Sequence, residues 1–233
     1  EEAQAEQEEE QEAEDVEEEE VEQEVEEEQS EEIYFNSKSK GEYRRLSNFY
    51  GNVEICYMQK RFKHPKMKEL FNRFKNATKE EFIAFLKILQ PDKEETNYWF
   101  DGDEPIRGIL AKLTGMIVTN PESQVFKKRA KSIAKYLDIS VEEVMQSDKI
   151  TTDEDMQECL AEKYQIPEFR ELLLKTGNAP LHERPMRGKP NDWTFPGNDK
   201  LGKMLIEIRD EIKKESQERF ERKDEPIKQP KKK

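Results

Sequence analysis

The sequence contains few of the residues that bind metals or form disulfides. Among 233 residues there are two cysteines, Cys56 and Cys159, and two histidines, His64 and His182. The cysteines form no C-x-x-C pair and no histidine cluster accompanies them, so neither a zinc site nor a disulfide framework is indicated. A serine-histidine-aspartate arrangement is not indicated either, because no nucleophile elbow occurs. We therefore expect no bound metal and, from the cysteines, a reducing compartment.

Long apolar runs and phosphate-binding glycine motifs are also missing. No stretch approaches the roughly 20 apolar residues that cross a membrane, and the acidic first segment is the opposite of the basic start of a signal peptide. Neither the Walker nor the Rossmann spacing of glycines occurs, so no nucleotide cofactor is indicated. These absences predict a soluble, intracellular, cytoplasmic protein with no cofactor and no membrane partner.

Charge is concentrated at the two ends of the chain. Residues 1–32 hold nineteen glutamates and one aspartate without any lysine or arginine, a formal charge of −20, so the total of −14 leaves +6 on the rest. Residues 213–233 account for +4 of this, which leaves residues 33–212 nearly neutral. Like charges repel and there is little apolar surface to offset chain entropy, so we expect an acidic disordered tail over 1–32. The folded domain is expected over 33–212 and a basic helical extension or tail over 213–233.

The acidic tail has two interpretations. It either solvates the chain or binds basic partners, among them the lysine-rich C-terminal end. Salt screens charges beyond about 10 Å, so partners recruited through the tails would be held by weak electrostatic attraction.

Helical signals dominate the domain. Apolar residues recur every three or four positions, which is the spacing of one helix face. Residues 53–62 contain no helix breaker and are expected to form one helix. Capping boxes, prolines and a terminal glycine mark further helices, which we expect after Thr78, at Pro105, from Asn120–Pro121, after Ser140, after Thr152, up to Thr176–Gly177 and from Asp199 to about Ile212. Short strands are expected at Ile33–Phe35 and within Leu181–Phe195, so the fold class is mainly α (α+β): a single compact helical domain with a few short strands.

One carboxylate, Glu54, stands beside polar and aromatic residues. At helical spacing Glu54 and Arg61 share a face, together with Tyr57 and Met58. A lone glutamate on a helix is usually a solvated surface charge. Arg61 either pairs with Glu54, binds a phosphate through both ends of its guanidinium, or forms a surface ion pair.

The residues before Glu54 are of the types found around a sugar or a base. Asn48 supplies hydrogen bonds, and Phe49 and Tyr50 supply aromatic surface. An aromatic pair ahead of a helix more often packs in the core, so both interpretations stay open.

A second group of candidates lies near the C-terminal end. Trp193 precedes the expected start of the last helix, where it either stacks on a base or covers the core. Asn198 and Asp199 lie at that start, where free backbone N–H groups can hold an anion. Glu183 is either a second carboxylate or a partner that orders loop donors.

These two groups, in this order, resemble the NADAR (YbiA-like) family. Ser47-Asn48-Phe49 and the helix with Glu54 match the family's first motifs, and the later matches are Leu172–Gly177, Leu181–Glu183, Trp193, Gly197–Gly202 and Ile206–Arg209. The resemblance implies a NADAR-like domain over 33–212 and an N-glycosidase, with Glu54 as its catalytic carboxylate. It further implies stacking by Phe49, Tyr50 and Trp193, and phosphate binding by Arg61 and the Gly197–Gly202 loop.

The implied substrate is a ribosylated pyrimidine phosphate, such as an early riboflavin-pathway intermediate, or ADP-ribose linked to a nucleobase. Cleaving a ribose carbon–nitrogen bond passes through an oxocarbenium-like state, which a carboxylate stabilises or supplies with activated water.

The chain also departs from the family pattern. Gly51-Asn52-Val53 stands where the family has Trp-Pro-x-Ser before the glutamate, Lys60-Arg61 replaces Gln-Lys, and Asp199 replaces an asparagine. Tyr98-Trp99-Phe100 either restores the lost stacking surface or belongs to the core. These departures favour a rival, a non-catalytic binding module that keeps the fold. A nucleic-acid-binding protein is a third option, based on the basic end, but the neutral domain argues against it.

Overall fold

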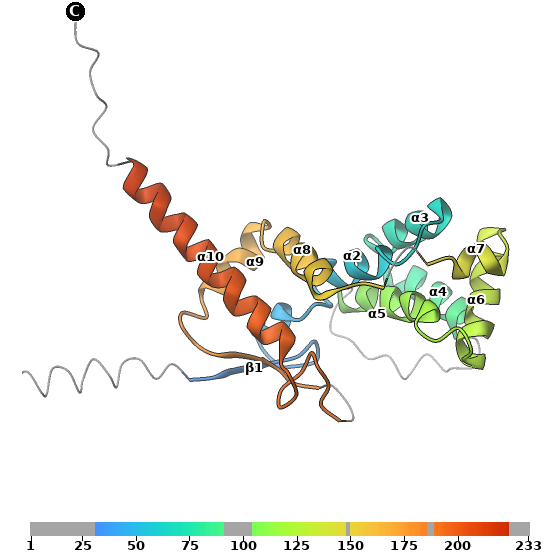
Figure 1. The fold of residues 1–233 in the computed structure, drawn as a ribbon, viewed down its shortest axis with the longest axis horizontal. Helices are drawn as coiled ribbons and strands as arrows, with labels where there is room; N and C mark the ends of the chain where they lie inside the picture. Colours follow the sequence, from blue (N-terminus) through green and yellow to red (C-terminus); the bar gives the residue numbers. More distant parts are fainter. Residues whose placement is uncertain (1–30, 91–103, 148–149, 186–188, 224–233) are drawn as a thin grey trace, which may run out of the picture.

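The computed structural model describes residues 31–90, 104–147, 150–185 and 189–223, which form a mainly helical fold with one small sheet (Figure 1). The described elements are β1 (Ile33–Phe35), the 3₁₀ helix η1 (Glu42–Leu46), α2 (Val53–Gln59), α3 (Pro65–Phe74), α4 (Lys79–Leu89), α5 (Glu104–Gly115), the 3₁₀ helix η3 (Met116–Val118), α6 (Gln124–Leu137), α7 (Val141–Met145), α8 (Asp153–Lys163), α9 (Pro167–Leu174), β2 (Leu181–Glu183) and α10 (Lys200–Lys223). The mainly α fold class is thereby confirmed. The predicted disorder of 1–32 concerns residues that lie outside the described part, apart from the last two, and Tyr98-Trp99-Phe100 lie outside it as well.

Side-chain caps start the helices at the expected residues. Thr78, Ser140 and Thr152 each accept a hydrogen bond from the backbone N–H three residues later, and the acidic side chain of that later residue accepts one from the cap's own N–H. Each such box satisfies two backbone donors that the helix itself leaves unpaired. The helix expected from Asn120–Pro121 begins later, at Gln124, because the Ser123 N–H bonds the Asn120 carbonyl at 3.0 Å and closes a turn first.

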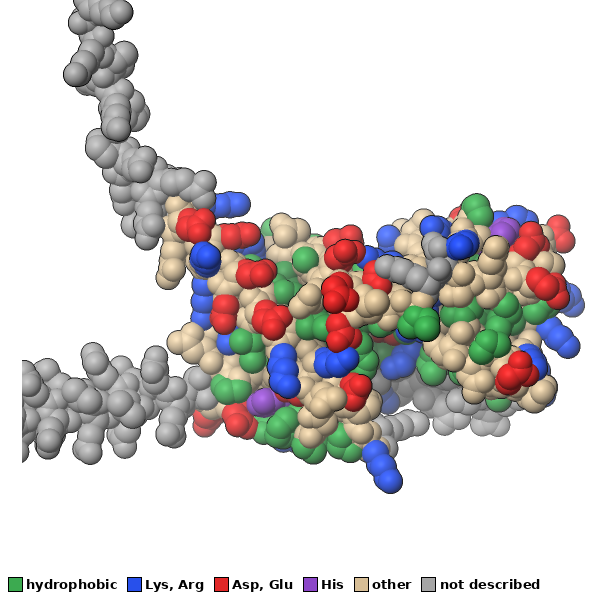
Figure 2. All heavy atoms as spheres, in the orientation of Figure 1, with side chains coloured by type: hydrophobic (Ala, Val, Ile, Leu, Met, Phe, Trp, Pro, Cys, Tyr) green, Lys and Arg blue, Asp and Glu red, His purple; other side chains and the backbone are tan. Residues whose placement is uncertain are grey.

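Three further helices differ from expectation. α2 ends at Gln59 and not at residue 62, since the Arg61 and Phe62 N–H groups bond carbonyls only three residues back. α3 is not among the expected helices, although it begins with a proline at its first position and buries an apolar stripe of its own. α10 runs past Ile212 to Lys223, since residues 213–223 contain neither glycine nor proline and are mostly good helix formers. Its apolar stripe ends where the helix extends beyond the packed domain into solvent (Figure 1). The exposed faces of α8 and α10 carry acidic side chains, which gather over the middle of the molecule in Figure 2.

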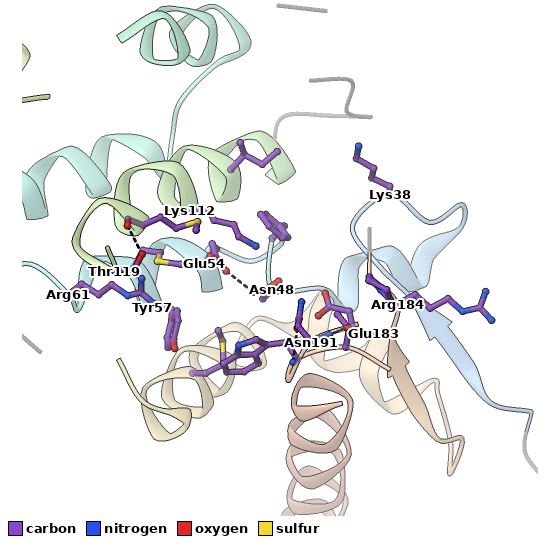
Figure 3. Close-up of a pocket in the computed structure, with 18 residues that line it drawn as sticks. Lys38, Asn48, Glu54, Tyr57, Arg61, Lys112, Thr119, Glu183, Arg184 and Asn191 are labelled. Atoms are coloured by element: carbon purple, nitrogen blue, oxygen red, sulfur yellow. Dashed lines mark hydrogen bonds between the residues drawn. The ribbon is translucent and has the colours of Figure 1, made fainter. Parts of the chain in front are cut away.

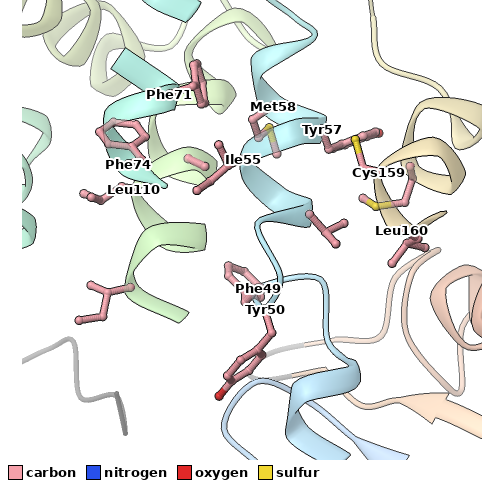
Figure 4. Close-up of a cluster of buried hydrophobic side chains, with 14 of the residues drawn as sticks. Phe49, Tyr50, Ile55, Tyr57, Met58, Phe71, Phe74, Leu110, Cys159 and Leu160 are labelled. Carbon is pink, nitrogen blue, oxygen red and sulfur yellow. The ribbon is translucent and has the colours of Figure 1, made fainter. Parts of the chain in front are cut away.

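Helix α2 lies at the centre of the fold. It packs mainly against α5 on one side and α8 on the other, and it buries Val53 and Ile55 completely. Figure 4 shows these contacts, with Phe71, Phe74 and Leu110 on one side of α2 and Leu160 of α8 on the other. Each fully buried large side chain stabilises the fold by about 1.5–3 kcal/mol, so α2 is held firmly between its neighbours.

The small sheet joins the two ends of the domain. β1 and β2 pair in parallel, with Ile33 opposite Leu181 and Phe35 opposite Glu183. The Arg184 N–H extends the pairing with a 2.8 Å bond to the Phe35 carbonyl. α10 begins against the back of β2, where a Cβ on Gly202 would lie 2.0 Å from the Leu181 carbonyl oxygen. Only glycine permits such a short distance between the two backbones. This close contact fixes the Gly197–Gly202 loop beside β2.

The two cysteines form a disulfide, so the expectation that none is present is wrong. Cys56 of α2 and Cys159 of α8 are bonded, with their Cα atoms 5.8 Å apart. They are separated by 103 residues, and the packing of α2 on α8 brings them together. No local sequence motif predicts this packing. The expectation of a reducing compartment, which followed from the missing framework, loses its basis.

In the described part of the chain, the structure contains no helix with the length and apolar content to span a membrane.

Candidate functional site

A cleft of about 560 Å³ opens between α2, α5 and the segment that follows β2 (Figure 3). Eighteen of the described residues line it. They come from both ends of the domain, which the parallel pairing of β1 and β2 brings together. The volume falls within the range of pockets for small organic ligands, roughly 300–1,000 Å³.

Glu54 is a buried and hydrogen-bonded polar group of the cleft. Its side chain is only 2% exposed, and Asn48 Nδ2 donates to its Oε2 at 2.6 Å. The Glu54 N–H in turn donates to the Asn48 carbonyl at 3.0 Å, so Asn48 holds the glutamate at both backbone and side chain. Gly51 and Asn52 make this possible, because both adopt positive φ, 67° and 61°, and turn the chain from Asn48 back into α2. The interpretation of Glu54 as a solvated surface charge is therefore wrong.

The charge of Glu54 is balanced between burial and nearby cations. Burial raises the pKa of the Glu54 carboxyl, while Lys112 on α5 and Arg61 after α2 act in the opposite direction. A hydrogen bond from Asn48 also favours the carboxylate form. The group is thus partly desolvated but has partners for a negative charge.

Glu183 places a second carboxyl in the same cleft. It is 9% exposed, and burial raises its pKa to about 8, helped by the negative charges of Glu54 and Asp199 and opposed by Lys112 and a hydrogen bond from Ser47. The Ser47 hydroxyl lies 3.4 Å from Glu183 Oε1 and 3.4 Å from Asn48 Oδ1. It has one hydrogen and so donates to one of them at a time. With a pKa of about 8, Glu183 holds a proton at pH 7.

Aromatic and sulfur-containing side chains form one wall. Tyr57 and Trp193 meet edge to face with ring centroids 6.2 Å apart, and three methionines, from α2, η3 and α8, line the cleft as well. The Arg61 guanidinium lies over the Tyr57 ring at 5.4 Å, and Lys200 lies 5.7 Å from the Trp193 ring centroid. Such a wall accepts a flat, uncharged ring.

Cations lie elsewhere in the cleft. Lys38 and Arg184 both line it, on the opposite side of Glu54 and Asn48 from Tyr57 and Arg61 in the view of Figure 3. Lys112 also lines it and places its ammonium 5.3 Å from the Phe49 ring centroid. The cleft thus combines an apolar wall, two carboxyls and a basic rim.

The structure brings most of the predicted site residues together. Six of the nine line this cleft, namely Asn48, Phe49, Glu54, Arg61, Glu183 and Trp193. Arg61 does so with its guanidinium anchored: Nε donates to Thr151 Oγ1 at 3.0 Å and Nη1 to the Gly115 carbonyl at 3.3 Å. It therefore belongs to the cleft wall and is not the surface ion pair considered above.

The other three predicted residues lie outside the lining. Tyr50 is 4% exposed and its hydroxyl donates to the Ser37 carbonyl at 3.2 Å, so it packs in the core. Asn198 is exposed and its Nδ2 donates to Asp192 at 2.9 Å. Stacking by Tyr50 does not fit its buried position, whereas ligand contact by Asn198 stays a prediction.

Asp199 acts behind the cleft. Its carboxylate makes a 2.6 Å hydrogen bond with His182 Nδ1 and accepts the Glu183 N–H at 3.3 Å. The loop Gly197–Gly202 thus supports β2, and none of its residues lines the cleft. Phosphate binding by this loop stays a prediction.

Lys112 is the main cleft residue that the sequence candidates miss. It lies on α5 three residues after Ile109 and four before Met116, and all three line the cleft. A single lysine in an otherwise apolar face at helical spacing is the signal that points to it. Lys38, Asn191 and Arg184 stand in loops or at a strand end and give no such signal.

The described residues offer no metal site, since nowhere among them do three or more histidine, cysteine, aspartate or glutamate side chains gather in a suitable arrangement. The carboxyls of the cleft instead contact amide, hydroxyl and cationic groups. The chemistry available here is therefore that of carboxyl groups, a nearby ammonium and a hydrophobic wall.

The chain was compared with protein-family models, curated proteins and solved structures, and none of them matches it. The resemblance to NADAR proteins thus remains a hypothesis based on the order of short motifs. The functional argument depends on the geometry of the cleft.

Proposed function

We propose that the cleft hydrolyses the N-glycosidic bond between a ribose and a heterocyclic base. The observation that carries the proposal is the pair of buried carboxyls, Glu54 held by Asn48 and Glu183 protonated at neutral pH, in a cleft with an aromatic wall. In this proposal the hydrogen bond from Asn48 favours the carboxylate form of Glu54, and the two carboxyls divide the roles of base and acid. Burying two acids costs stability, so their presence in the cleft favours a role in proton transfer.

The two carboxyls have different tasks in this proposal. Glu54, as carboxylate, faces the sugar, stabilises the cation that develops at the ribose carbon and accepts a proton from the attacking water. The water oxygen bonds to that carbon as its bond to nitrogen breaks, and the electron pair stays on the nitrogen. Glu183 gives its proton to the departing base and regains one from solvent. The products are the free base and the ribose with a new hydroxyl.

The walls of the cleft suggest how such a substrate lies. The base would pack on Tyr57 and Trp193, and an anionic group on the ribose would face Lys38 and Lys112. The substrate class is therefore a ribosylated base that carries phosphate. A 5-amino-6-(5-phosphoribosylamino)pyrimidine and an ADP-ribosylated guanine in DNA are the two candidates that the motif resemblance adds.

The direct test incubates the purified protein with each of these two substrates and measures release of the sugar. Turnover of one and not the other identifies the substrate. If neither releases sugar but either one raises the melting temperature, the protein is a binding module that keeps the cleft, and the hydrolase proposal fails.

Glu183 predicts the alkaline limit of activity. Its folded-state pKa of about 8 lies above the ordinary value of 4.5, so the required proton is lost, and the rate falls, as pH rises through about 8. The free energy of unfolding depends on pH in the same direction. The contribution of the protonated Glu183 is fully present below pH 4.5, and it is lost as pH rises through the folded-state pKa. Glutamine does not ionise, so Glu183→Gln should not lose this contribution at high pH. The variant should therefore be more stable than the wild type at pH 9 by on the order of 2–4 kcal/mol.

Rate profiles and urea unfolding at pH 6 and pH 9 check both effects. An alkaline limit that remains near pH 8 in Glu183→Gln would contradict the assignment of that proton to Glu183.

Trp193 predicts an effect on substrate binding. Trp193→Ala removes a large part of the wall and should raise KM by roughly tenfold or more, since base–aromatic stacking contributes about 1–3 kcal/mol. Phe195→Ala is the matched control, because Phe195 lies two residues further along, is 37% exposed and packs against Tyr34 and His182 outside the cleft. Steady-state kinetics on both variants check this, and equal effects would contradict a stacking role.

A further inference from the structure

Helix α8 contacts the catalytic segment through several residues on one face. Met156 lines the cleft, Cys159 is bonded to Cys56 of α2, and Lys163 follows one turn later. At the start of the same helix Asp155 forms an ion pair with Lys60 at 3.5 Å. One helix therefore touches both the element that carries Glu54 and the segment that precedes it.

Lys163 is an unusual residue for this position. Its side chain is 1% exposed, and its ammonium donates to the carbonyl oxygens of Arg45, Leu46 and Ser47 at 2.6, 3.2 and 2.9 Å. Burying an ammonium is costly unless its donors are satisfied, and these three carbonyls at the end of η1 supply the acceptors; the Ser47 carbonyl also accepts the Tyr50 N–H at 3.1 Å. The last of the three belongs to the residue directly before Asn48.

The backbone is shaped to admit this lysine. A Cβ on Gly51 would lie 2.7 Å from Lys163 Cγ, and Gly51 also has the positive φ that favours glycine. The turn from Asn48 to α2 thus wraps around the lysine stem. Displacement of the stem would be transmitted to Asn48, whose amide reaches Glu54.

We propose that Lys163 is a positioning residue for the catalytic pair: its ammonium holds the three carbonyls before Asn48 and thereby fixes the Asn48 amide on the Glu54 carboxylate. The mechanistic meaning of this role rests on the proposed hydrolase function. The contact itself does not, because it can be measured without any substrate.

The test is a double-mutant cycle on the full-length, disulfide-bonded protein. The pKa of the Glu54 carboxyl is measured by carbon-13 NMR in the wild type, Lys163→Met, Asn48→Ala and the double variant, and its signal is assigned by its loss in Glu54→Gln. Lys112 on α5, Arg61 after α2 and Glu183 on β2 face Glu54 in all four proteins, so their effects cancel.

Both single variants should raise this pKa by about one pH unit, the size expected when a hydrogen bond to a charged group is lost. The double variant should rise no further than Asn48→Ala, because both changes remove the same hydrogen bond. An unchanged pKa in Lys163→Met, or two additive shifts, would overturn the proposal.

Lys175→Met is the control. Lys175 is exposed and forms an ion pair with Glu42 of η1. Its substitution tests whether the loss of any lysine contact with η1 has the same effect. Lys175→Met should leave the Glu54 pKa unchanged. If Lys163→Met does not fold, Lys163→Gln is measured instead. Its shorter, uncharged side chain does not reach all three carbonyls, so the same rise is expected, and a wild-type pKa there would overturn the proposal.

Kinetics then separate this inference from the function. If the wild type hydrolyses the substrate, Lys163→Met should lower kcat and move the acidic limit of the rate profile upward with little change in KM. If the wild type shows no turnover while the Glu54 pKa shifts as stated, the positioning role stands and the hydrolase proposal fails.

Discussion

Glu54→Gln should lower kcat by roughly 10²- to 10⁴-fold, the range typical for loss of a positioned acid or base. The amide keeps the shape of the side chain and still offers an oxygen to Asn48 Nδ2, so the cleft should remain intact. It cannot carry negative charge or accept a proton from water. KM should therefore change little, and the loss should lie in the chemical step.

The same variant should not lose stability. Burial raises the pKa of Glu54 above its ordinary value, so the wild-type carboxyl contributes less to stability as pH rises through that folded pKa. Glu54→Gln should therefore melt at the same temperature as the wild type or higher at pH 7. Glu162→Gln, an exposed glutamate on α8, is the control for kinetics and melting and should match the wild type in both. A Glu54→Gln protein with normal kcat would show that Glu54 is not catalytic.

Reduction of the Cys56–Cys159 disulfide should have the largest effect on stability. The bond restricts the unfolded chain by closing a loop between residues 103 positions apart, and a native disulfide commonly contributes about 2–4 kcal/mol. For a domain of this size the melting temperature should fall by roughly 5–15 °C. Calorimetry with and without dithiothreitol measures the difference.

The control is the double variant Cys56→Ser, Cys159→Ser. It should melt near the temperature of the reduced wild type and show no response to dithiothreitol. A wild-type melting temperature that does not change on reduction would contradict a formed disulfide. If the disulfide also stabilises the cleft, reduced protein should lose substrate affinity before it unfolds.

Local sequence rules predicted the helices well because their signals are local. A cap and its partner are three residues apart, and the apolar stripes repeat within a single helix, as at Thr78 and Thr152. The shared face of Glu54 and Tyr57 follows from helical spacing within α2, whereas Arg61 lies beyond the end of that helix; all three line the cleft. The length of α10 was underestimated because the end of an apolar stripe marks where a helix leaves the core, not where it stops.

The parts that were missed depend on contacts between distant segments. The direction of the Tyr50 side chain is decided by a turn with two positive φ values and by the carbonyl of Ser37. The place of Asp199 depends on the pairing of β1 with β2, which lie far apart in sequence. The disulfide and the contact of Lys163 with three carbonyls likewise depend on how α8 packs against distant segments. Sequence periodicity does not predict such contacts.

The central claim is that water cleaves a ribose–base bond in this cleft. The most direct measurement is a reaction in water enriched in oxygen-18, with mass analysis of both products from the two candidate substrates. The account predicts that the released ribose phosphate or ADP-ribose carries one heavy oxygen and the free base carries none. Release of no sugar from either substrate, or a sugar without the label, would contradict it.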